Sequence, residues 1–301
     1  REAEQRFGCR TYPSYQEMLG DHEIEVVAVA SPSHLHTEHT LQALQAGYHV
    51  LVEKPMAESL EAADRMIATA RASGRLLSVN QNYRFRAGFV KVQEVMASGV
   101  LGCIIQFRIA WHSFSRRWDW QTLKEYRGGL LNNSGAHVVD LALQLMGEGE
   151  VRVFSHMECT PNYAGDAESH VKIILQAPGA PLADLEITTA CCYPQDEWLV
   201  MGTLGGLSGT PASLRWKHYD PAAVPPLVLS REPTPDRSYN REELPWQEET
   251  WTSDGEDGYG YPRVWSDLYA SIREGAPLAI TPESARRQIA VLDECRRQCP
   301  V

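Results

Sequence analysis

The chain has 301 residues, of which 43% are apolar and 22% are charged, so it is long enough for two domains of a globular protein. No apolar run approaches the roughly 20 residues that span a bilayer, so we expect no membrane-spanning segment. The net charge of -11 and the lack of a basic face argue against a nucleic-acid binder.

The first 100 residues alternate helix and strand patterns at the spacing of βαβ units, which predicts a parallel sheet. Apolar runs at Val26–Ala30, His49–Val52 and Leu76–Val79 predict its strands. Ser59 is expected to cap the helix between the second and third strands, and Gly74 to end it. The helices expected in this part are Arg1–Phe7, Tyr15–Leu19, Thr37–Ala46 and Leu60–Ser73.

From Gly102 onward, apolar and polar residues alternate, which predicts a second domain over residues 101–301 with a large, open, mostly antiparallel sheet. Gly205-Gly206 is expected to close a hairpin, and Pro221–Glu249 to form a long excursion loop. The expected strands are Cys103–Trp111, Val151–Cys159, His170–Leu175, Ala183–Cys191, Trp198–Leu204 and Leu207–Leu214, followed by helices at Tyr261–Glu274 and Thr281–Gln298.

The clearest clue to chemistry is Glu53-Lys54-Pro55, which directly follows the His49–Val52 strand. Ligands bind at the carboxyl ends of strands in open α/β sheets, and Lys54 stands at such an end. Pro55 stops the strand and forces a turn after the lysine. The alternative interpretation is a strand-ending ion pair followed by a proline stop.

A second loop, Ser31-Pro32-Ser33, follows the Val26 strand and could shape a tight turn against a flat ligand, or simply connect strand to helix. His34, His36 and His39 lack the further ligands that a zinc site needs, so we expect no metal. The seven cysteines form no CxxC pair, and their odd number predicts a reducing compartment, the cytoplasm.

A helix that starts near Asn133 would place Asn133, His137, Asp140 and Gln144 on one face. His137 would then lie in the first turn, where the helix dipole favours the neutral imidazole that a proton acceptor needs. The alternative is a capped helix with a solvated polar face.

Aromatic and guanidinium side chains gather in three short segments and suit a polyhydroxy ligand through stacking and hydrogen bonds. They suit an oligomer interface as well. A glycine-rich segment at Gly202–Gly209 does not match GxGxxG and lies among expected antiparallel strands, so we interpret it as a turn. The aromatic segments are Tyr83-Arg84-Phe85, Trp111-His112 and Arg116–Gln121, the last with Trp118 and Trp120.

Together these motifs resemble the Gfo/Idh/MocA oxidoreductase family over nearly the whole chain. The resemblance rests on Ser31-Pro32, on the Ala46–Pro55 segment with its Glu-Lys-Pro, on Asn82–Phe85, and on Gly128-Gly129 with His137 and Asp140. It implies a Rossmann-type domain over residues 1–100 that binds NAD or NADP, and a domain over 101–301 for substrate binding and oligomerisation. A homodimer or homotetramer is implied.

The resemblance also implies roles for individual residues. Lys54, His137 and Asn133 would be catalytic, with His137 as the acid or base on the substrate hydroxyl. The cofactor would be bound by Ser31, Pro32, Ser33, His36, Glu53, Lys54, Pro55 and Asn82. The substrate, a carbohydrate-like small molecule, would be bound by Arg84, Trp118, Trp120, Asn133 and His137.

Two features depart from the family pattern. Asn133 stands where many members carry an aspartate, so the proton relay would rest on Lys54 and His137. We also expect that the first strand, the GxGxxG turn, its helix and the second strand of the Rossmann domain are missing from this chain.

Three functions are compatible with this pattern. The first is an NAD(P)-dependent oxidoreductase that transfers hydride between the nicotinamide and a secondary alcohol or ketone of a sugar, cyclitol or related polyol. The second is an NAD-dependent glycoside hydrolase or lyase that oxidises the sugar transiently. The third is a non-catalytic, ligand-binding member of the family.

Overall fold

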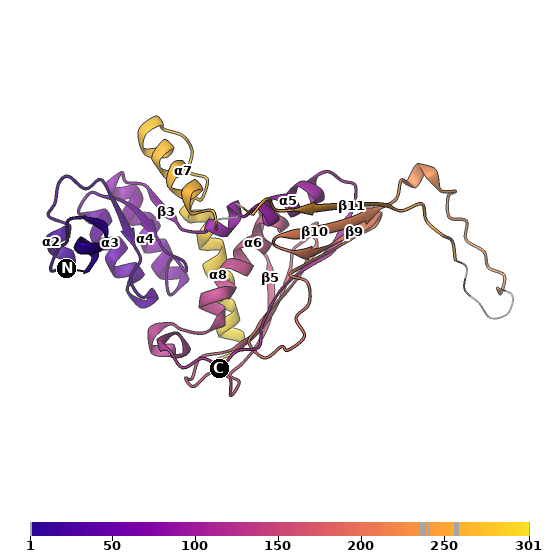
Figure 1. Ribbon diagram of the computed structural model, residues 1–301, viewed down its shortest axis with the longest axis horizontal. Coiled ribbons are helices and arrows are strands. Elements are labelled where there is room, and N and C mark those ends of the chain that lie inside the picture. The colour runs from indigo at the N-terminus through magenta and orange to yellow at the C-terminus, as the bar shows by residue number, and fades with distance from the viewer. Residues whose placement is uncertain (1, 235–238, 240, 256–258, 301) are drawn as a thin grey trace.

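The computed structural model describes residues 2–234, 239, 241–255 and 259–300. Its strands form two sheets, one of three strands near the N-terminus and one of eight strands in a second, larger lobe (Figure 1). The predicted fold class, a Rossmann-type parallel sheet with a second, mostly antiparallel sheet, is confirmed. In the described part of the chain, no helix combines the length and the apolar character needed to cross a membrane.

The small sheet is parallel, in the order β1-β2-β3. Val50, Leu51 and Val52 of the middle strand are all buried, as expected where helices cover a parallel sheet. Helix α3 packs against β1, β2 and α4, and α8 contacts α4 and β3. The elements up to residue 79 are α1 (Glu2–Phe7), α2 (Tyr15–Met18), β1 (Val26–Val29), η1 (Ser33–Leu35), α3 (His36–Gln45), β2 (His49–Val52), α4 (Leu60–Ser73) and β3 (Leu77–Val79).

The residues at the two ends of helix α4 explain why its bounds can be predicted from the sequence. Ser59 Oγ accepts a hydrogen bond from the Ala62 backbone N–H at 3.2 Å, which caps the first turn. Gly74 has a φ of 63°, a left-handed conformation that stops the helix. Between them Ala63 and Met66 are fully buried against the small sheet's core.

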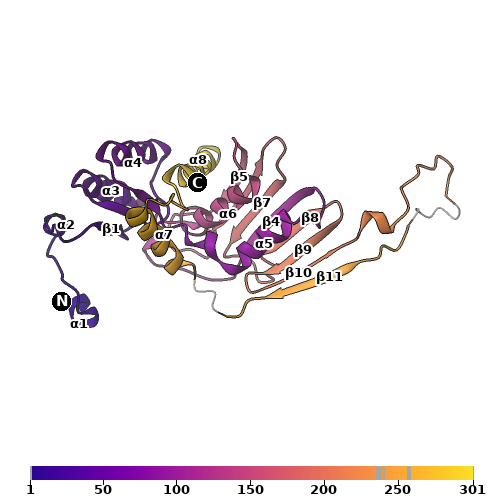
Figure 2. The same cartoon turned by 90° about the horizontal axis from the view of Figure 1, so that it is seen from above.

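The large sheet has the order β11-β10-β9-β8-β4-β7-β6-β5 and is antiparallel except for one central pair, β4 with β7, which is parallel. Burial alternates along β6 and β7, because one face packs on helices and the other is open. Figure 2 shows α5, α6 and α8 on the covered side. The strands are β4 (Ile104–His112), β5 (Arg152–Glu158), β6 (His170–Gln176), β7 (Leu182–Thr188), β8 (Trp198–Gly202), β9 (Gly205–Thr210), β10 (Ser213–His218) and β11 (Gln247–Thr252).

The predicted hairpin turn at Gly205-Gly206 is wrong, because both glycines lie inside β9. A β-carbon on Gly205 would collide with the Lys217 carbonyl oxygen of β10, so the glycine serves close strand approach. Between β10 and β11 the chain leaves the body as a long arm that carries η6 (Pro221–Ala223) (Figure 1). The predicted excursion is therefore present, although residues 235–238 and 240 lie outside the described residues.

The segment around Asn133 also differs from expectation. The helix α6 spans Ala136–Met146, and a π-helical turn, η5 (Leu131–Gly135), precedes it and contains Asn133. A further helix, α5 (Ala87–Ala97), was not predicted and packs into the core of the large sheet. The remaining short turns are η2 (Asn82–Phe85), η3 (Trp120–Thr122) and η4 (Lys124–Tyr126), and the final helices are α7 (Tyr261–Glu274) and α8 (Pro282–Gln298).

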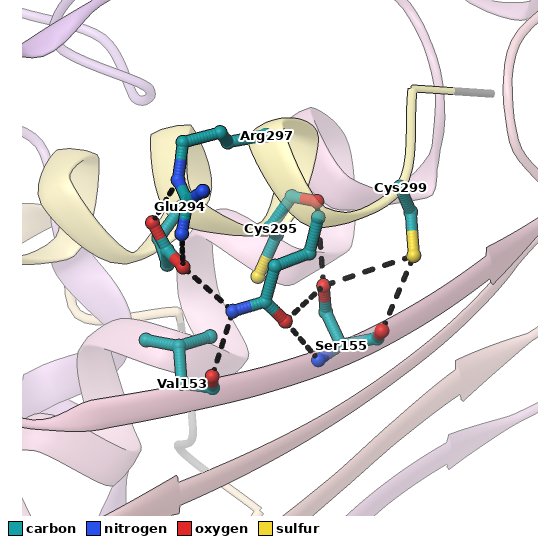
Figure 3. Close-up of polar contacts among 7 residues, drawn as sticks. Val153, Ser155, Glu294, Cys295, Arg297 and Cys299 are labelled. Carbon is teal, nitrogen blue, oxygen red and sulfur yellow. Dashed lines mark hydrogen bonds and ion pairs between the residues drawn. The ribbon is translucent and has the colours of Figure 1, made fainter.

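Helix α8 joins the two lobes. Ala285 and Ile289 pack in the core of the small sheet, whereas Leu292 and Cys295 pack in the core of the large one. At its C-terminal end, Gln298 forms hydrogen bonds with the backbone of Val153 and Ser155 in β5, two residues that are labelled in Figure 3. The boundary at residue 100 stays a prediction; in space, the small core also takes in residues from α7 and α8.

Candidate active site

The predicted site residues meet at a hollow of about 330 Å³ at the carboxyl ends of β1 and β2. The two loops that follow these parallel strands form one side, and the segment around η3 and η5 forms the other. Parallel strands end at the same edge of a sheet, which is why loops about 20 residues apart in sequence converge here. The predicted residues that line the hollow are Ser31, Pro32, Ser33, His36, Glu53, Lys54, Pro55, Trp120 and Asn133.

Lys54 reaches from the end of β2 to the segment that precedes α6. Its Nζ donates to the Asn133 backbone oxygen at 2.7 Å and to the Asn133 Oδ1 at 3.2 Å. Burial lowers the pKa of Lys54 to about 8, while the nearby Glu53 carboxylate opposes that shift. A lysine with such a pKa can both give and take a proton near neutral pH.

His137 lies one turn after Asn133, in the first turn of α6, and only 8% of it is exposed. Its ring stacks on Tyr83 with 4.0 Å between centroids. The pKa of His137 is lowered well below its usual value, by burial first and then by the positive charges of Lys54 and Arg86. The ring is therefore neutral, as predicted, and desolvation is the largest cause.

The polar face of α6 is not solvated, so the alternative of a capped surface helix is wrong. Asp140 is 1% exposed and accepts two hydrogen bonds from Arg84, one of them from Nε to Oδ2 at 2.7 Å. Arg84 also donates to Ser284 Oγ at 3.0 Å, which ties η2 to α6 and α8. Burial raises the pKa of Asp140, and the charge of Arg84 opposes that rise.

His36 holds the two cofactor-side loops together. Its Nδ1 lies 2.8 Å from the Pro55 carbonyl oxygen and its Nε2 lies 2.8 Å from that of Ser31. The residue is 2% exposed, and burial lowers its pKa although both carbonyl groups act to raise it. His36 therefore links the ends of β1 and β2, and its ring nitrogens are both engaged within the chain.

Two predicted cofactor residues, Glu53 and Asn82, form hydrogen bonds with distant parts of the chain. Glu53 Oε1 accepts a hydrogen bond of 2.6 Å from Nδ2 of Asn80, which follows β3 directly. Asn82, 2% exposed, donates from Nδ2 to the Tyr259 backbone oxygen. The Asn82 amide thus anchors the segment before α7 and does not line the hollow.

The predicted substrate residues divide between the hollow and its surroundings. Asn133 and Trp120 line it, whereas His137, 8% exposed, is not among the residues that line it. Arg84 is held by Asp140, with only 8% of its side chain exposed. Trp118 lies in the same loop as Trp120 but is 80% exposed and lines none of this hollow.

The hollow is also lined by residues for which no site role was predicted, namely Gln121, Arg127, Gly128, Gly129 and Asn132. The glycine pair was the available signal. Gly129 has a φ of 96°, and a β-carbon there would collide with the Glu168 carboxylate. A β-carbon on Gly128 would collide with the Gln121 backbone in the same way. A side chain at either glycine would therefore displace the segment that leads into η5.

A larger hollow, of about 850 Å³, lies over β8 to β11. None of the predicted catalytic or cofactor-binding residues lines it, so chemistry and not size identifies the site. Among the described residues, no three or more histidine, cysteine or acidic side chains are arranged to hold a metal ion.

Comparison with known proteins connects this geometry to a family. Residues 1–81 match a family model described as an oxidoreductase family with an NAD-binding Rossmann fold. Residues 89–208 match the model of the GFO/IDH/MocA C-terminal domain.

Among curated relatives, inositol 2-dehydrogenase 2 of Saccharopolyspora erythraea is 27% identical over 92% of this chain and 84% of its own length. D-glucoside 3-dehydrogenase of Escherichia coli is 36% identical, but the match covers only 48% of this chain and 42% of that enzyme. An NAD-binding protein from Listeria innocua has the same fold, with a TM-score of 0.82 and 19% identity over 100% of this chain and 86% of its own.

Proposed function

Because the chain belongs to the Gfo/Idh/MocA oxidoreductase family, we propose that it is an NAD- or NADP-dependent dehydrogenase acting on a carbohydrate-like substrate. The reaction would move hydride between the nicotinamide and a secondary alcohol or ketone of a sugar, cyclitol or related polyol. The observation that carries the proposal is Lys54, a partly buried lysine at a strand end with a pKa lowered to about 8 and open to a small hollow.

The residues present fit a nicotinamide dinucleotide at its reactive end. The hollow lies at the carboxyl ends of parallel strands, where such ligands bind, and its volume of about 330 Å³ is that of a small-molecule pocket. The Ser31-Pro32-Ser33 loop and Glu53 would hold the cofactor, with Glu53 steadied by Asn80. A bound nicotinamide would accept or supply the hydride.

The chain's own residues would manage the proton of the substrate hydroxyl. Oxidation of a secondary alcohol releases this proton as the hydride leaves carbon, and ketone reduction needs it returned. Lys54 can serve in both directions because its pKa lies near neutrality. His137, buried and neutral, has an Nδ1 without a hydrogen-bond partner and could share the proton.

The test is titration of the chain with NAD+, NADH, NADP+ and NADPH, followed by turnover with a panel of sugars, glycosides and cyclitols. Reduced nicotinamide should accumulate with at least one substrate. Lys54→Met should keep dinucleotide binding and lose turnover by at least about a hundredfold. Lys91→Met, on α5 where the lysine side chain is 28% exposed and pairs with Glu94, should keep both.

Other outcomes would select the alternatives. Release of an aglycone without net change in the dinucleotide would replace the dehydrogenase with a hydrolase or lyase. If the parent chain binds a sugar or cyclitol without turnover, and Lys54→Met still binds it, the chain is a non-catalytic ligand-binding protein. Failure to bind any dinucleotide would overturn the proposal.

We further propose that the chain works as a homodimer or homotetramer in the cytoplasm. The open face and edge of the large sheet expose Phe154 and Met201 by 60% and 43%, which is compatible with contact between copies. All seven cysteines are unpaired, as expected in a reducing compartment. A single-chain mass in light scattering would contradict the assembly.

A further inference from the structure

A series of side-chain hydrogen bonds runs from the surface loop after β4 to Lys54. Arg117 Nη2 donates to Gln121 Oε1 at 2.6 Å, and Asn133 Nδ2 donates to the same oxygen at 3.3 Å. Lys54 Nζ in turn donates to Asn133 Oδ1 at 3.2 Å. Gln121 therefore stands between a permanently charged arginine and the amide that contacts the lysine.

The chemistry of the donors fixes the direction of this series. A guanidinium can only donate, so Arg117 selects the oxygen end of the Gln121 amide. That oxygen can only accept, so it attracts the Nδ2 end of Asn133 and turns Oδ1 toward Lys54. If the Asn133 amide rotated by half a turn, its Nδ2 group would face the lysine ammonium.

The rest of the loop holds Gln121 in place. Arg117 is itself fixed by Asp119, with contacts of 3.0 Å and 2.8 Å, and lies over the Tyr163 ring. The Gln121 backbone oxygen accepts a hydrogen bond of 2.8 Å from the Gly129 N–H. Both ends of the residue, side chain and backbone, are thus tied to the segment that carries Asn133.

We propose that Gln121 is a positioning residue for the reaction, which acts through Asn133 to keep an uncharged acceptor on Lys54. The proposal rests on the proposed function, since it assigns Gln121 to the same site. A carboxylate at position 133 would form an ion pair with Lys54. In this proposal Asn133 instead gives the lysine an uncharged acceptor, and Gln121 keeps that acceptor oriented.

Several charges bear on Lys54 besides this relay. Glu53 raises its pKa, whereas burial lowers it more strongly, to about 8. His137 and His36 both feel the lysine's charge, and burial lowers the pKa of both, for His137 to well below its usual value, so the His137 ring is neutral near pH 7. Arg127 lines the same hollow. A negative charge introduced at position 121 would therefore add to Glu53 and raise the pKa of Lys54.

Two substitutions separate orientation from charge. Gln121→Leu keeps the approximate size but removes the acceptor, so the Asn133 amide is free to rotate. Gln121→Glu keeps an acceptor for both Arg117 and Asn133 and adds a charge. Gln176→Leu, at an exposed position at the end of β6, is the matched control.

The readout is the pKa of Lys54 itself, obtained from the pH dependence of its acylation by an amine-reactive reagent, followed by mass spectrometry of the Lys54 peptide. Gln121→Leu should lower this pKa and Gln121→Glu should raise it, each by about half a unit to one unit. Gln176→Leu should leave it unchanged. These measurements need no substrate.

Kinetics supply the second readout. Gln121→Leu should reduce kcat about tenfold with little change in the KM for the dinucleotide. Gln121→Glu should restore most of kcat but move the pH dependence of alcohol oxidation to higher pH. Circular dichroism and the melting temperature establish that each variant is folded, and if Gln121→Leu does not fold, Gln121→Glu alone still tests the charge effect.

The proposal is overturned if the pKa of Lys54 is the same in folded Gln121→Leu, Gln121→Glu and the parent chain. It is also overturned if Gln121→Glu fails to recover activity while its Lys54 pKa stays unchanged. If no variant, nor the parent, turns over any substrate but the pKa shifts appear, the proposed dehydrogenase fails and the positioning role stands.

Discussion

Lys54 is a charged side chain that the fold holds in a poorly solvated place. Its pKa falls from 10.5 to about 8, and such a fall corresponds to about 3 kcal/mol of unfavourable free energy in the ammonium form. Two hydrogen bonds to Asn133 do not remove this penalty. A residue kept at such a cost is expected where function needs it.

Removing the ammonium should therefore stabilise the chain. Lys54→Met should raise the free energy of unfolding at pH 7 by up to about 3 kcal/mol. The unfolded state binds more protons than the folded state between pH about 8 and about 10.5, so the parent gains stability as pH rises through that window. The variant's advantage should shrink accordingly. Urea unfolding at pH 7 and near pH 10 measures both.

The control is Lys91→Met, which alters a lysine of α5 that is 28% exposed and paired with Glu94; it should lower the free energy of unfolding by less than about 1 kcal/mol. A Lys54→Met protein that is less stable than the parent at pH 7 would mean that the two contacts to Asn133 outweigh desolvation.

Also at the residue scale, Arg84 illustrates what a motif cannot say. The Asn-Tyr-Arg-Phe segment predicted a substrate contact for it, and that stays a prediction. In space Arg84 forms a buried ion pair with Asp140, and a partner removed from such a pair leaves an uncompensated charge. Its position in the sequence gave no sign of this partner, because Asp140 lies 56 residues away.

At the scale of elements, strand β5 shows how an edge of the large sheet is covered. It is the last strand in the order, so its outward N–H and C=O groups have no neighbouring strand among the described residues. Gln298 of α8 bonds to two of these groups. Its Oε1 accepts from the Ser155 N–H at 2.9 Å, and its Nε2 donates to the Val153 carbonyl at 2.8 Å; Figure 3 labels both strand residues. One side-chain amide thus satisfies a backbone donor and a backbone acceptor that a neighbouring strand would otherwise bond.

Substitution of this amide should be costly. Gln298→Leu leaves a backbone donor and a backbone acceptor without partners near Ser155, which is 5% exposed. We expect a loss of about 2 kcal/mol in the free energy of unfolding. Urea denaturation of Gln298→Leu beside Gln176→Leu measures it, and equal stabilities of the two would show that water replaces the glutamine.

The elements whose ends were predicted well differ in kind from those that were not. Ser59 and Gly74 act on the backbone next to them, so α4 begins and ends where its sequence says. The Gly205-Gly206 pair looked equally local, yet these glycines are set by contact with β10 and β8. The start of α6 was misplaced for a similar reason, since η5 is shaped by Glu168, whose Oε1 accepts from the Leu131 N–H at 2.8 Å.

At the scale of the whole molecule, α8 is shared by two cores. Ile289 belongs to the core around the small sheet, and Leu292, less than one turn further, belongs to the core around the large one. The hollow with Lys54 is likewise built from both lobes, because β2 supplies the lysine and η5 supplies its acceptor. The two lobes must keep their relative placement for the site to exist.

A cavity beside α8 should therefore destabilise both lobes. Leu292→Ala, at a fully buried position, should reduce the free energy of unfolding by about 3 kcal/mol. Hydrogen exchange should rise together in peptides from β2 and from β6. Leu227→Ala, 91% exposed on the arm, should change neither. Faster exchange in β6 alone would show that the lobes open independently.

The sequence by itself determined the parallel strands, the helices with strong caps, and the placement of Ser31, Glu53 and Lys54 at strand ends, because each depends on neighbours a few residues away. It also led to the family through the Glu-Lys-Pro and Gly-Gly motifs.

Only the tertiary structure decided that β4 pairs in parallel with β7, that burial lowers the pKa of His137, and that Asn133 donates a hydrogen bond to Gln121. Burial and long-range hydrogen bonds arise when distant segments meet, so no local pattern in the chain records them.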